Sequence, residues 1–273
     1  MPELPEVETI IRTLEKSLAG DTITQVKLYY PPLLEKDSPF DLSNLVGSTF
    51  THFSRRGKYL IFSFDTGFHW VVHLRMEGKY YLYNETMPKT THTHLILKTN
   101  YRYIHYLDTR KFSRMAVVQD LQGYLAGKKL GYEPFDSDLT AEYYHSRIHK
   151  SIRAIKNILL DQSIITGLGN IYADEVLYET QLHPLTQGVD ITLDQSQMII
   201  DASQKILTKA IAEGGTTIRS YTSSLGVSGL FQVSLQAYGR EGQKCNRCSS
   251  IMKRIVISGR SSVFCPQCQK EPS

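Results

Sequence analysis

All four cysteines of this 273-residue chain lie close together, and they constrain its fold more than any other feature. They form two C-x2-C pairs, Cys245 with Cys248 and Cys265 with Cys268, separated by sixteen residues. Each tight turn presents two thiolates, and two such turns complete the tetrahedral shell of a structural zinc ion. A segment of about 30 residues is too short to bury a core, so the metal has to supply folding energy. We predict one structural Zn²⁺.

Two disulfide bonds are the alternative use of these cysteines. The sequence has no apolar run near the length of a membrane span, and its first residues show no export signal. We therefore expect a cytoplasmic protein with no membrane contact, and disulfides are rare in that compartment. Zinc is favoured.

The residues between the two cysteine pairs predict a β-hairpin. Alternate positions from Ile251 to Ile257 share one face of a strand, and Ser258 and Gly259 form the turn. Arg260 follows that turn directly. It would point outward, either toward a nucleic-acid phosphate or simply into solvent.

Positive charge is concentrated in the same region. Residues 240–273 contain seven Lys or Arg and two acidic residues, whereas the other 239 residues contain 24 basic and 25 acidic residues. The net charges are therefore +5 and −1. A small basic module on a near-neutral body suggests a polyanionic partner, although a solvated tail has the same composition.

The body of the chain divides into a β-rich part and a helical part. Eight short segments rich in aromatic and branched residues predict an antiparallel sandwich or barrel. They are 22–30, 48–56, 58–65, 69–76, 78–83, 93–99, 101–108 and 114–120. Beyond a linker near residue 131, helices are expected at about 140–150, 152–162, 171–180 and 193–213. A capping box of Thr192 and Gln195 begins the last helix, and Gly214 and Gly215 end it.

Two glycine-containing segments have both a structural and a functional interpretation. Gly167 and Gly169 allow a sharp turn between two helices, and Asn170 would cap the second helix. Exposed N–H groups at such a turn can bind a phosphate, but glycine is also common in ordinary turns. The segment 214–232 has no periodicity and would be either a mobile lid or an inert connector.

The N-terminal sequence "MPELPEVET" predicts the start of a helix running from about Glu3 to Ala19. Proline is favoured in a first helical turn, where its missing N–H costs nothing. The carboxylates of Glu3 and Glu6 would complement the positive end of the helix dipole. On these rules alone Pro2, Glu3 and Glu6 have only a structural role.

Taken together and in order, eight motifs closely resemble the bacterial formamidopyrimidine-DNA glycosylase family, also called 8-oxoguanine-DNA glycosylase. The resemblance covers nearly the whole chain. The motifs are "PELPEVET", "SRRGKYLIF", "HLRMEGKY", "DTRKF", "LLDQ…TGLGNIYADEVL", "GGTTIR", "LQAYGREGQKC" and the four-cysteine finger. The related endonuclease VIII family usually begins Pro-Glu-Gly-Pro-Glu, whereas this chain has leucine at the third of those positions.

The resemblance implies an α+β fold in three parts. An N-terminal helix and antiparallel β-sandwich would occupy residues 1–131. A helical, helix-two-turn-helix DNA-binding domain with a lesion-capping loop would occupy 138–234, and the hairpin zinc finger 235–273. The partner would be double-stranded DNA containing oxidised purines or abasic sites, and we expect a monomer.

The resemblance also implies a catalytic mechanism. Removal of Met1 would free the nitrogen of Pro2 to attack C1′ of the damaged nucleotide, and Glu3 would donate a proton. Lys58 would assist the first elimination and Arg260 the second, and Glu6 would position the sugar and the proline. Without the resemblance, Lys58 would be read as an ordinary lysine at a strand edge.

DNA contacts are implied in the same way. Met76, Arg110 and Phe112 would fill the space left by the flipped base, with Arg110 hydrogen-bonding the orphaned cytosine. From pattern alone, a place in the strand core is the favoured reading of Met76 and Phe112. The other residues expected to contact DNA are His92, Lys156, Asn170 and Tyr238. His92 and His94 also have the spacing of a metal pair, but the sequence offers no third ligand.

The pocket for the flipped base is expected to involve Glu77, Thr217, Arg219 and Tyr221. Three features depart from the family pattern: Ser113 replaces a glycine, Thr91 and Thr93 replace lysine and aspartate, and the lid sequence differs. Base selectivity therefore stays open. An endonuclease VIII-like oxidised-pyrimidine glycosylase and a non-catalytic zinc-finger lesion sensor are the alternatives, and the intact Pro2, Glu3 and Lys58 argue against the sensor.

Overall fold

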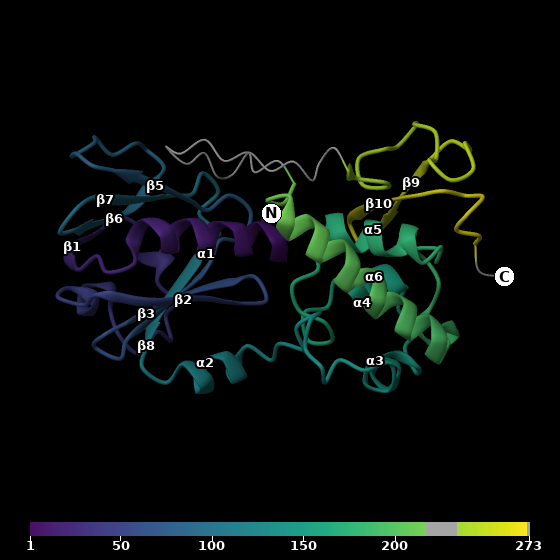
Figure 1. Ribbon diagram of the computed structural model, residues 1–273, viewed down its shortest axis with the longest axis horizontal. Helices are drawn as coiled ribbons and strands as arrows, with labels where there is room; N and C mark the ends of the chain where they lie inside the picture. Colours follow the sequence, from purple (N-terminus) through teal and green to yellow (C-terminus); the bar gives the residue numbers. More distant parts are fainter. Residues whose placement is uncertain (217–233, 272–273) are drawn as a thin grey trace. The chain divides into compact units, whose positions relative to one another are not determined.

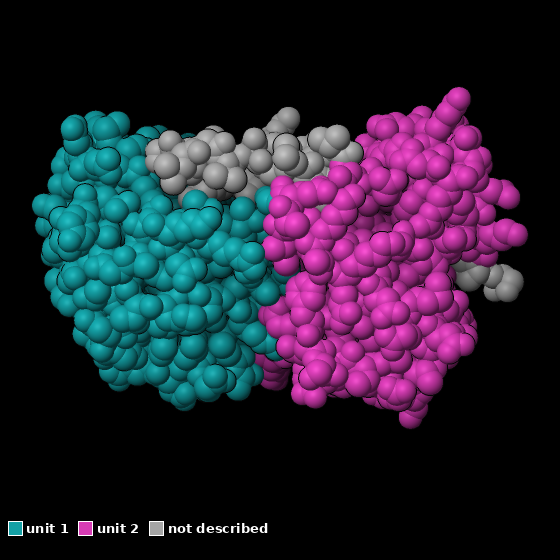
Figure 2. Space-filling model, viewed as in Figure 1, with its two compact units in different colours: residues 1–128, 214–229 teal, residues 129–213, 230–273 magenta. Residues whose placement is uncertain are grey.

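The computed structural model describes residues 1–216 and 234–271, and it has an α+β fold. The chain divides into two compact units, coloured separately in Figure 2. Unit 1 consists of Met1–Lys128 and Gly214–Gly229, and unit 2 of Lys129–Glu213 and Leu230–Ser273. No helix among the described residues is long and apolar enough to cross a membrane.

Unit 1 is a β-sandwich of two four-stranded antiparallel sheets, ordered β1-β6-β7-β5 and β2-β3-β4-β8. All eight segments predicted from the sequence are strands. Their bounds are β1 Ile23–Leu28, β2 Phe50–Arg56, β3 Tyr59–Phe64, β4 His69–His73, β5 Lys79–Tyr83, β6 Thr93–Thr99, β7 Tyr103–Leu107 and β8 Arg114–Val118. Two 3-10 turns, η1 Pro31–Leu33 and η2 Leu42–Leu45, lie between β1 and β2.

The core of unit 1 follows from alternation along these strands. Successive side chains of a strand point to opposite faces, so every second residue turns inward. Phe62 and Trp70 stack at 4.8 Å between ring centroids, and both are at most 1% exposed. Helix α1 (Leu4–Leu18) adds an apolar face that includes Ile10 and Leu14 to the same core.

A short helix missed by the sequence analysis covers the other face of the second sheet. Helix α2 (Leu121–Gly127) places Leu121, Tyr124 and Leu125 against Ile61 and Val71. With seven residues and two glycines, α2 has too little periodicity to be predicted from sequence. Tertiary packing stabilises it.

Unit 2 contains four α-helices among its described residues, close to the predicted positions. They are α3 Ala141–Ile148, α4 Ile155–Leu159, α5 Asn170–Glu179 and α6 Leu193–Ala212, with a 3-10 turn η3 Gly188–Asp190. The predicted capping box at Thr192 and Gln195 is present. Gly214 and Gly215, at φ +75° and +80°, follow the end of α6.

The finger contains the predicted hairpin. Strands β9 (Lys253–Ile257) and β10 (Arg260–Phe264) pair in antiparallel register. The turn residues Ser258 and Gly259 both have positive φ, +50° and +77°, as a two-residue hairpin turn requires. Figure 1 shows the hairpin beside α5, the helix that it packs against.

Candidate functional site

The start of α1 is held by the carboxylate of Glu6. Its Oε2 accepts the backbone N–H of Glu3 at 2.9 Å, which completes a capping box. Its Oε1 accepts the backbone N–H of Thr216 at 2.9 Å and the Thr216 hydroxyl at 3.1 Å. Glu3 and Glu6 are only 2% and 3% exposed. Glu6 therefore fixes the first residues of the chain against the segment that follows α6.

Gly215 allows this close approach to Glu6. A Cβ atom at Gly215 would lie 2.7 Å from Oε1 of Glu6, and the backbone there has φ +80°. Both conditions exclude other residues without a shift of the loop. The glycine pair thus does more than end a helix: it lets residue 216 reach Glu6.

The predicted helix start is confirmed, but Pro2 does not lie in the first turn. Glu3 is the N-cap and α1 begins at Leu4, so the first-turn proline is Pro5. Pro2 is buried and lies immediately before the cap, preceded by the exposed Met1. An N-terminal residue at this position lies at the positive end of the helix dipole without being part of the helix.

Lys58 lies in the turn between β2 and β3, and its side chain is 6% exposed. Arg55 ties this turn to α1, because its guanidinium donates to Glu8 at 2.9 Å and to the carbonyl of Gly57 at 2.9 Å. Burial alone would raise the pKa of Glu8, but Arg55 and Arg12 outweigh it and the pKa is lowered. The helix that follows Pro2 and the turn that carries Lys58 are thus joined by an ion pair.

His73 belongs beside Lys58, and the sequence analysis missed it. It pairs with Tyr59 across β3 and β4, and the two rings meet edge to face at 4.7 Å. Burial, with the charges of Arg75 and Lys58, lowers the pKa of His73 to about 3. Its Nδ1 accepts the backbone N–H of Arg75 at 3.0 Å. His73 is therefore neutral at physiological pH, and only its register opposite Tyr59 could have indicated its place.

Asp108 organises the loop that carries Arg110 and Phe112. It is fully buried and accepts the backbone N–H groups of Arg110 at 3.0 Å and Ser113 at 2.9 Å. The Ser113 hydroxyl lies 2.7 Å from the same carboxylate and 2.9 Å from the carbonyl of Leu74. The serine that departs from the family pattern thus adds polar contacts that a glycine could not make.

The structure brings the three residues expected to fill the helix gap onto adjoining loops. Ser113 joins the Asp108 loop to the turn after β4, and Thr109 contacts Glu77 in that turn. Met76 and Phe112 are 37% and 48% exposed, so they are not the core residues that pattern alone would suggest. The guanidinium of Arg110 lies over the Phe112 ring at 4.9 Å.

His92 and His94 do not form a metal pair. His92 is exposed just before β6, whereas His94 is buried and its Nε2 lies 2.7 Å from the carbonyl oxygen of Asp108. The carbonyl of His92 accepts the backbone N–H of Asp108 at 3.0 Å. His92 is thus exposed on a segment anchored to the same residue as Arg110.

Lys156 and Asn170 differ from expectation. Lys156 is fully buried, with Nζ 2.6 Å from Asp174 and 2.9 Å from the carbonyl oxygen of Asn170, so it cannot reach a phosphate directly. The N-cap of α5 is Gly169, not Asn170. The Asn170 side chain instead donates to the carbonyl of Ser261 on β10 at 3.0 Å.

Asp174 and Glu175 connect α5 to the finger. Asp174 accepts the Ser262 hydroxyl and the backbone N–H of Val263, the latter at 3.1 Å. Glu175 accepts three consecutive backbone N–H groups, those of residues 236–238, at 2.8–2.9 Å. Burial raises the pKa of Glu175, although these hydrogen bonds oppose the shift. Tyr238, half-buried, is positioned by the last of them.

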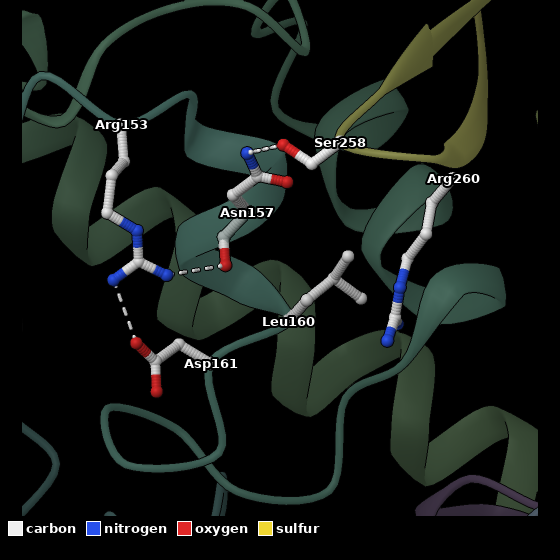
Figure 3. Close-up of a pocket in the computed structure, with 6 residues that line it drawn as sticks. All are labelled: Arg153, Asn157, Leu160, Asp161, Ser258 and Arg260. Atoms are coloured by element: carbon white, nitrogen blue, oxygen red, sulfur yellow. Dashed lines mark hydrogen bonds and ion pairs between the residues drawn. The ribbon is translucent and has the colours of Figure 1, made fainter.

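Arg260 borders a depression of about 340 Å³ in unit 2, lined by Arg153, Asn157, Leu160, Asp161 and Ser258. Figure 3 shows Arg153 and Arg260 on either side of Leu160. Arg153 is paired with Asp161 at 2.8 Å, and Asn157 donates to the Ser258 hydroxyl at 2.9 Å. Arg260 is exposed at the rim of this depression.

The four cysteines fit a zinc ion. Their Sγ atoms all lie within 4.8 Å of one another, with Cys248 and Cys265 at 3.4 Å and Cys245 and Cys268 at 4.0 Å. A tetrahedral site with Zn–S bonds of about 2.3 Å requires separations near 3.8 Å. These thiols are not joined as disulfides.

Three residues predicted to line the base pocket lie outside the described residues: Thr217, Arg219 and Tyr221.

A sandwich unit beginning with a capped helix, a helical unit, and a four-cysteine finger define a DNA glycosylase of the helix-two-turn-helix class. Sequence models of the formamidopyrimidine-DNA glycosylase N-terminal domain and H2TH domain match residues 1–115 and 130–222, and that of the zinc finger found in FPG and IleRS matches 242–270. The chain belongs to the formamidopyrimidine-DNA glycosylase family.

Relatives align over almost the full chain. This chain is 41% identical to a formamidopyrimidine-DNA glycosylase of Bacillus cereus, and the alignment covers 98% of this chain and 99% of the relative. It is 43% identical to that of Exiguobacterium sibiricum, covering 99% of each. The structure matches MutM in complex with DNA containing carbocyclic 8-oxo-G (TM-score 0.92, 38% identity, 99% and 100% covered). It also matches Lactococcus lactis Fpg with DNA containing an abasic site (TM-score 0.91, 38% identity, 98% and 100% covered).

Replacing Asp108 with alanine should loosen the loop that carries Arg110 and Phe112, because several buried hydrogen bonds lose their acceptor. We expect a loss of about 2–4 kcal/mol in the free energy of unfolding. Binding to a duplex with an abasic analogue should weaken, as measured by fluorescence anisotropy. The control is Asp120→Ala, which removes an exposed cap of α2. Equal affinity in the two variants would contradict the positioning role.

Removing zinc by chelation, or replacing Cys265 with serine, should abolish DNA binding because the hairpin loses its folding energy. The strands of unit 1 should persist in the circular dichroism spectrum. Unchanged DNA affinity after metal loss would exclude the finger from DNA recognition.

Proposed function

We propose that this enzyme excises oxidised purines, chiefly 8-oxoguanine and formamidopyrimidines, from duplex DNA and then cuts the strand at the abasic site. The observation that carries the proposal is the anchored start of α1. Glu6 holds the backbone N–H of Glu3, so the residue before Glu3 occupies a defined position. That residue is Pro2. The family membership supplies the substrate class.

Pro2 would become the nucleophile after removal of Met1. A free α-amine has a pKa near 8, about two units below that of lysine, so more of it is unprotonated at neutral pH. The helix N-terminus behind it favours the neutral amine further. The nitrogen lone pair would form a bond to C1′ as the C1′–N bond to the base breaks, and the base would leave with a proton.

Glu3 and Lys58 are suited to the accompanying proton transfers. Glu3 would donate a proton at the sugar or base, which opens the ring and gives an iminium with Pro2. That cation withdraws electrons from C2′, so loss of a C2′ proton can expel the 3′ phosphate. A second elimination would expel the 5′ phosphate. Lys58 would assist the first elimination and contact a phosphate, and Arg260 would assist the second.

The proposed role of Glu6 differs from the proton-transfer roles of Glu3 and Lys58. Both of its oxygens already accept hydrogen bonds from Glu3 and Thr216. It would therefore position Pro2 and the sugar rather than transfer protons.

Met76, Arg110 and Phe112 would occupy the space that an extruded nucleotide leaves. The exposure of Met76 and Phe112 and their placement on adjoining loops support this role. An apolar wedge replaces lost stacking, and Arg110 would pair with the orphaned base. Asp108 would hold the loop in shape. His92, on a segment anchored to Asp108, would contact the DNA nearby.

Three residues of unit 2 would bind phosphates of the DNA: Asn170, Tyr238 and Arg260. Lys156 would act through them, because its ammonium holds the carbonyl of Asn170 and the carboxylate of Asp174. A zinc ion on Cys245, Cys248, Cys265 and Cys268 would fix the hairpin that presents Arg260. With four thiolates the metal site is closed, so the ion stabilises the fold and leaves catalysis to the side chains.

Glu77 and residues 217–226 would border the base pocket. The hydrogen-bonded position of Glu77 beside Thr109 supports its part in this assignment. The enzyme would act as a monomer in the cytoplasm, associated with the nucleoid. Excision of oxidised pyrimidines is the alternative that the divergent lid sequence leaves open.

A retained N-terminal residue should abolish activity while leaving the fold unchanged. We expect a variant with one alanine inserted between Met1 and Pro2 to lose both base release and strand cleavage, because the proline nitrogen is then an amide. Gel assays on duplexes with 8-oxoguanine or thymine glycol would measure this. The matched control is the same protein after proteolytic exposure of Pro2.

Faster cleavage of the thymine-glycol duplex would contradict the purine assignment. Full activity of the extended variant would contradict the proline mechanism. A loss of folding, visible as a changed circular dichroism spectrum, would instead mean that the insertion disturbs the Glu3–Glu6 cap.

A further inference from the structure

The sheet β1-β6-β7-β5 has an outer face that the proposed reaction does not use. Its inner face contributes Leu95, Leu97, Ile104 and Tyr106 to the core, so the alternate residues of the same strands point outward. The paired registers place these outward residues in two rows across the sheet. The rows are Tyr83–Tyr103–Lys98–Gln25 and Tyr81–His105–Ile96–Lys27.

Aromatic rings concentrate at the β5–β7 side of this face. The rings of Tyr81 and Tyr83 are nearly parallel, with an angle of 8° and centroids 6.4 Å apart. The Tyr83 ring meets His105 edge to face at 5.0 Å. Tyr103 lies opposite Tyr83 in the sheet. Tyr101, in the turn before β7, is 67% exposed.

Positive charge lies directly beside these rings. Lys98 and Lys27 are exposed, and the Lys98 ammonium lies 5.5 Å from the centroid of the Tyr103 ring. A hydrogen bond with Thr86, together with the charges of Lys98 and Lys27, holds the pKa of Tyr103 below its usual range. Both ammonium groups therefore act at one phenol. Lys79 adds a third lysine at the start of β5.

The two sheets of unit 1 differ in how their outer faces are covered. The outer face of β2-β3-β4-β8 carries aliphatic residues and is packed by α2. Figure 1 shows α2 beside β8, and α1 packs against β2 and β3 of the same sheet. No described helix packs on the outer face of β1-β6-β7-β5. This face carries tyrosines and lysines instead of the aliphatic residues found under α2.

We propose that this outer face binds unpaired DNA. Tyrosine rings on adjacent strands of an antiparallel sheet provide flat platforms on which bases stack. Lys98 and Lys27, on the β6 and β1 side of the same face, would neutralise the phosphates of the same strand. The site is distinct from the one that carries Pro2, and its ligand is an extended single strand.

The pattern favours a single strand over other polyanions. A duplex hides its base faces inside the stack, so the half-buried tyrosine rings of this face would gain nothing from it. An acidic peptide would engage the lysines and leave the rings unused. Only a chain with both phosphates and accessible bases would engage the rings on β5 and β7 together with the lysines on β6 and β1.

The test uses the full zinc-containing chain and a fluorescein-labelled oligothymidylate in an anisotropy titration at low salt. Binding should weaken about fivefold or more for each ring lost in Tyr83→Leu and Tyr103→Leu. The variants Tyr83→Phe and Tyr103→Phe keep the rings and should bind as the unaltered protein does. The pair Lys27→Glu and Lys98→Glu should lose about tenfold or more.

Control variants in unit 1 test whether an effect on binding comes only from the change of net charge or from a loss of folding. The pair Lys16→Glu and Lys36→Glu makes the same change of net charge at exposed positions on α1 and after η1. It should retain oligothymidylate binding. All variants should still cleave an 8-oxoguanine duplex, which shows that they fold. An oligomer with the same phosphates but no bases should bind about fivefold more weakly.

A competition experiment distinguishes the proposed single-strand site from the catalytic site. Protein saturated with a duplex containing a stable abasic analogue should still bind the oligothymidylate. Displacement by that duplex would overturn the proposal, because the single strand would then occupy the catalytic site. Equal binding by the leucine variants, or by polyglutamate in place of the oligothymidylate, would also overturn it. Loss of cleavage with retained single-strand binding would count against the proposed function alone.

Discussion

The hydrogen bonds of the Glu6 carboxylate are the constraint on which the rest of the structure depends. One oxygen caps α1 at Glu3 and the other holds Thr216, so residues far apart in sequence meet at the first turn of the chain. Chain termini commonly fray because nothing holds them. Here a buried capping box and the apolar face of α1 fix residue 3, and Pro2 is one peptide bond away. A nucleophile placed at position 2 would share that order without a binding pocket of its own.

The same device recurs in the segments that carry the other candidate residues. Asp108 holds the Arg110 loop, Glu175 holds residues 236–238, and Asp174 holds both Lys156 and the finger. Asp108 and Glu175 accept two and three backbone N–H groups of their loops, and Asp174 accepts the backbone N–H of Val263 and the hydroxyl of Ser262. Leaving such groups unsatisfied would cost about 1–3 kcal/mol each, so the carboxylates select one loop shape. The side chains proposed to contact DNA, Met76, Phe112 and Arg260, stay exposed.

Local signals made most of the fold predictable. Short segments rich in aromatic and branched residues indicated all eight strands of unit 1, capping residues located α6, and cysteine spacing located the finger. The burial of Lys156 was not predictable, because its partner Asp174 is eighteen residues away and both depend on packing against β10. Helix α2 and the neutral His73 were missed for the same reason: their states come from neighbours in space. The cap at Glu3 lies two residues after the position that Pro2 at the start of the helix would give, because the first-turn proline is Pro5.

The most direct test of the central claim is borohydride trapping on a duplex with one 8-oxoguanine. Reduction converts an iminium into a stable amine, so the enzyme should become covalently attached to the DNA. Peptide mapping should place the adduct on Pro2 of the chain that lacks Met1. An adduct on Lys58 or another lysine, or no adduct from protein that still releases the base, would contradict the assignment of Pro2 as nucleophile.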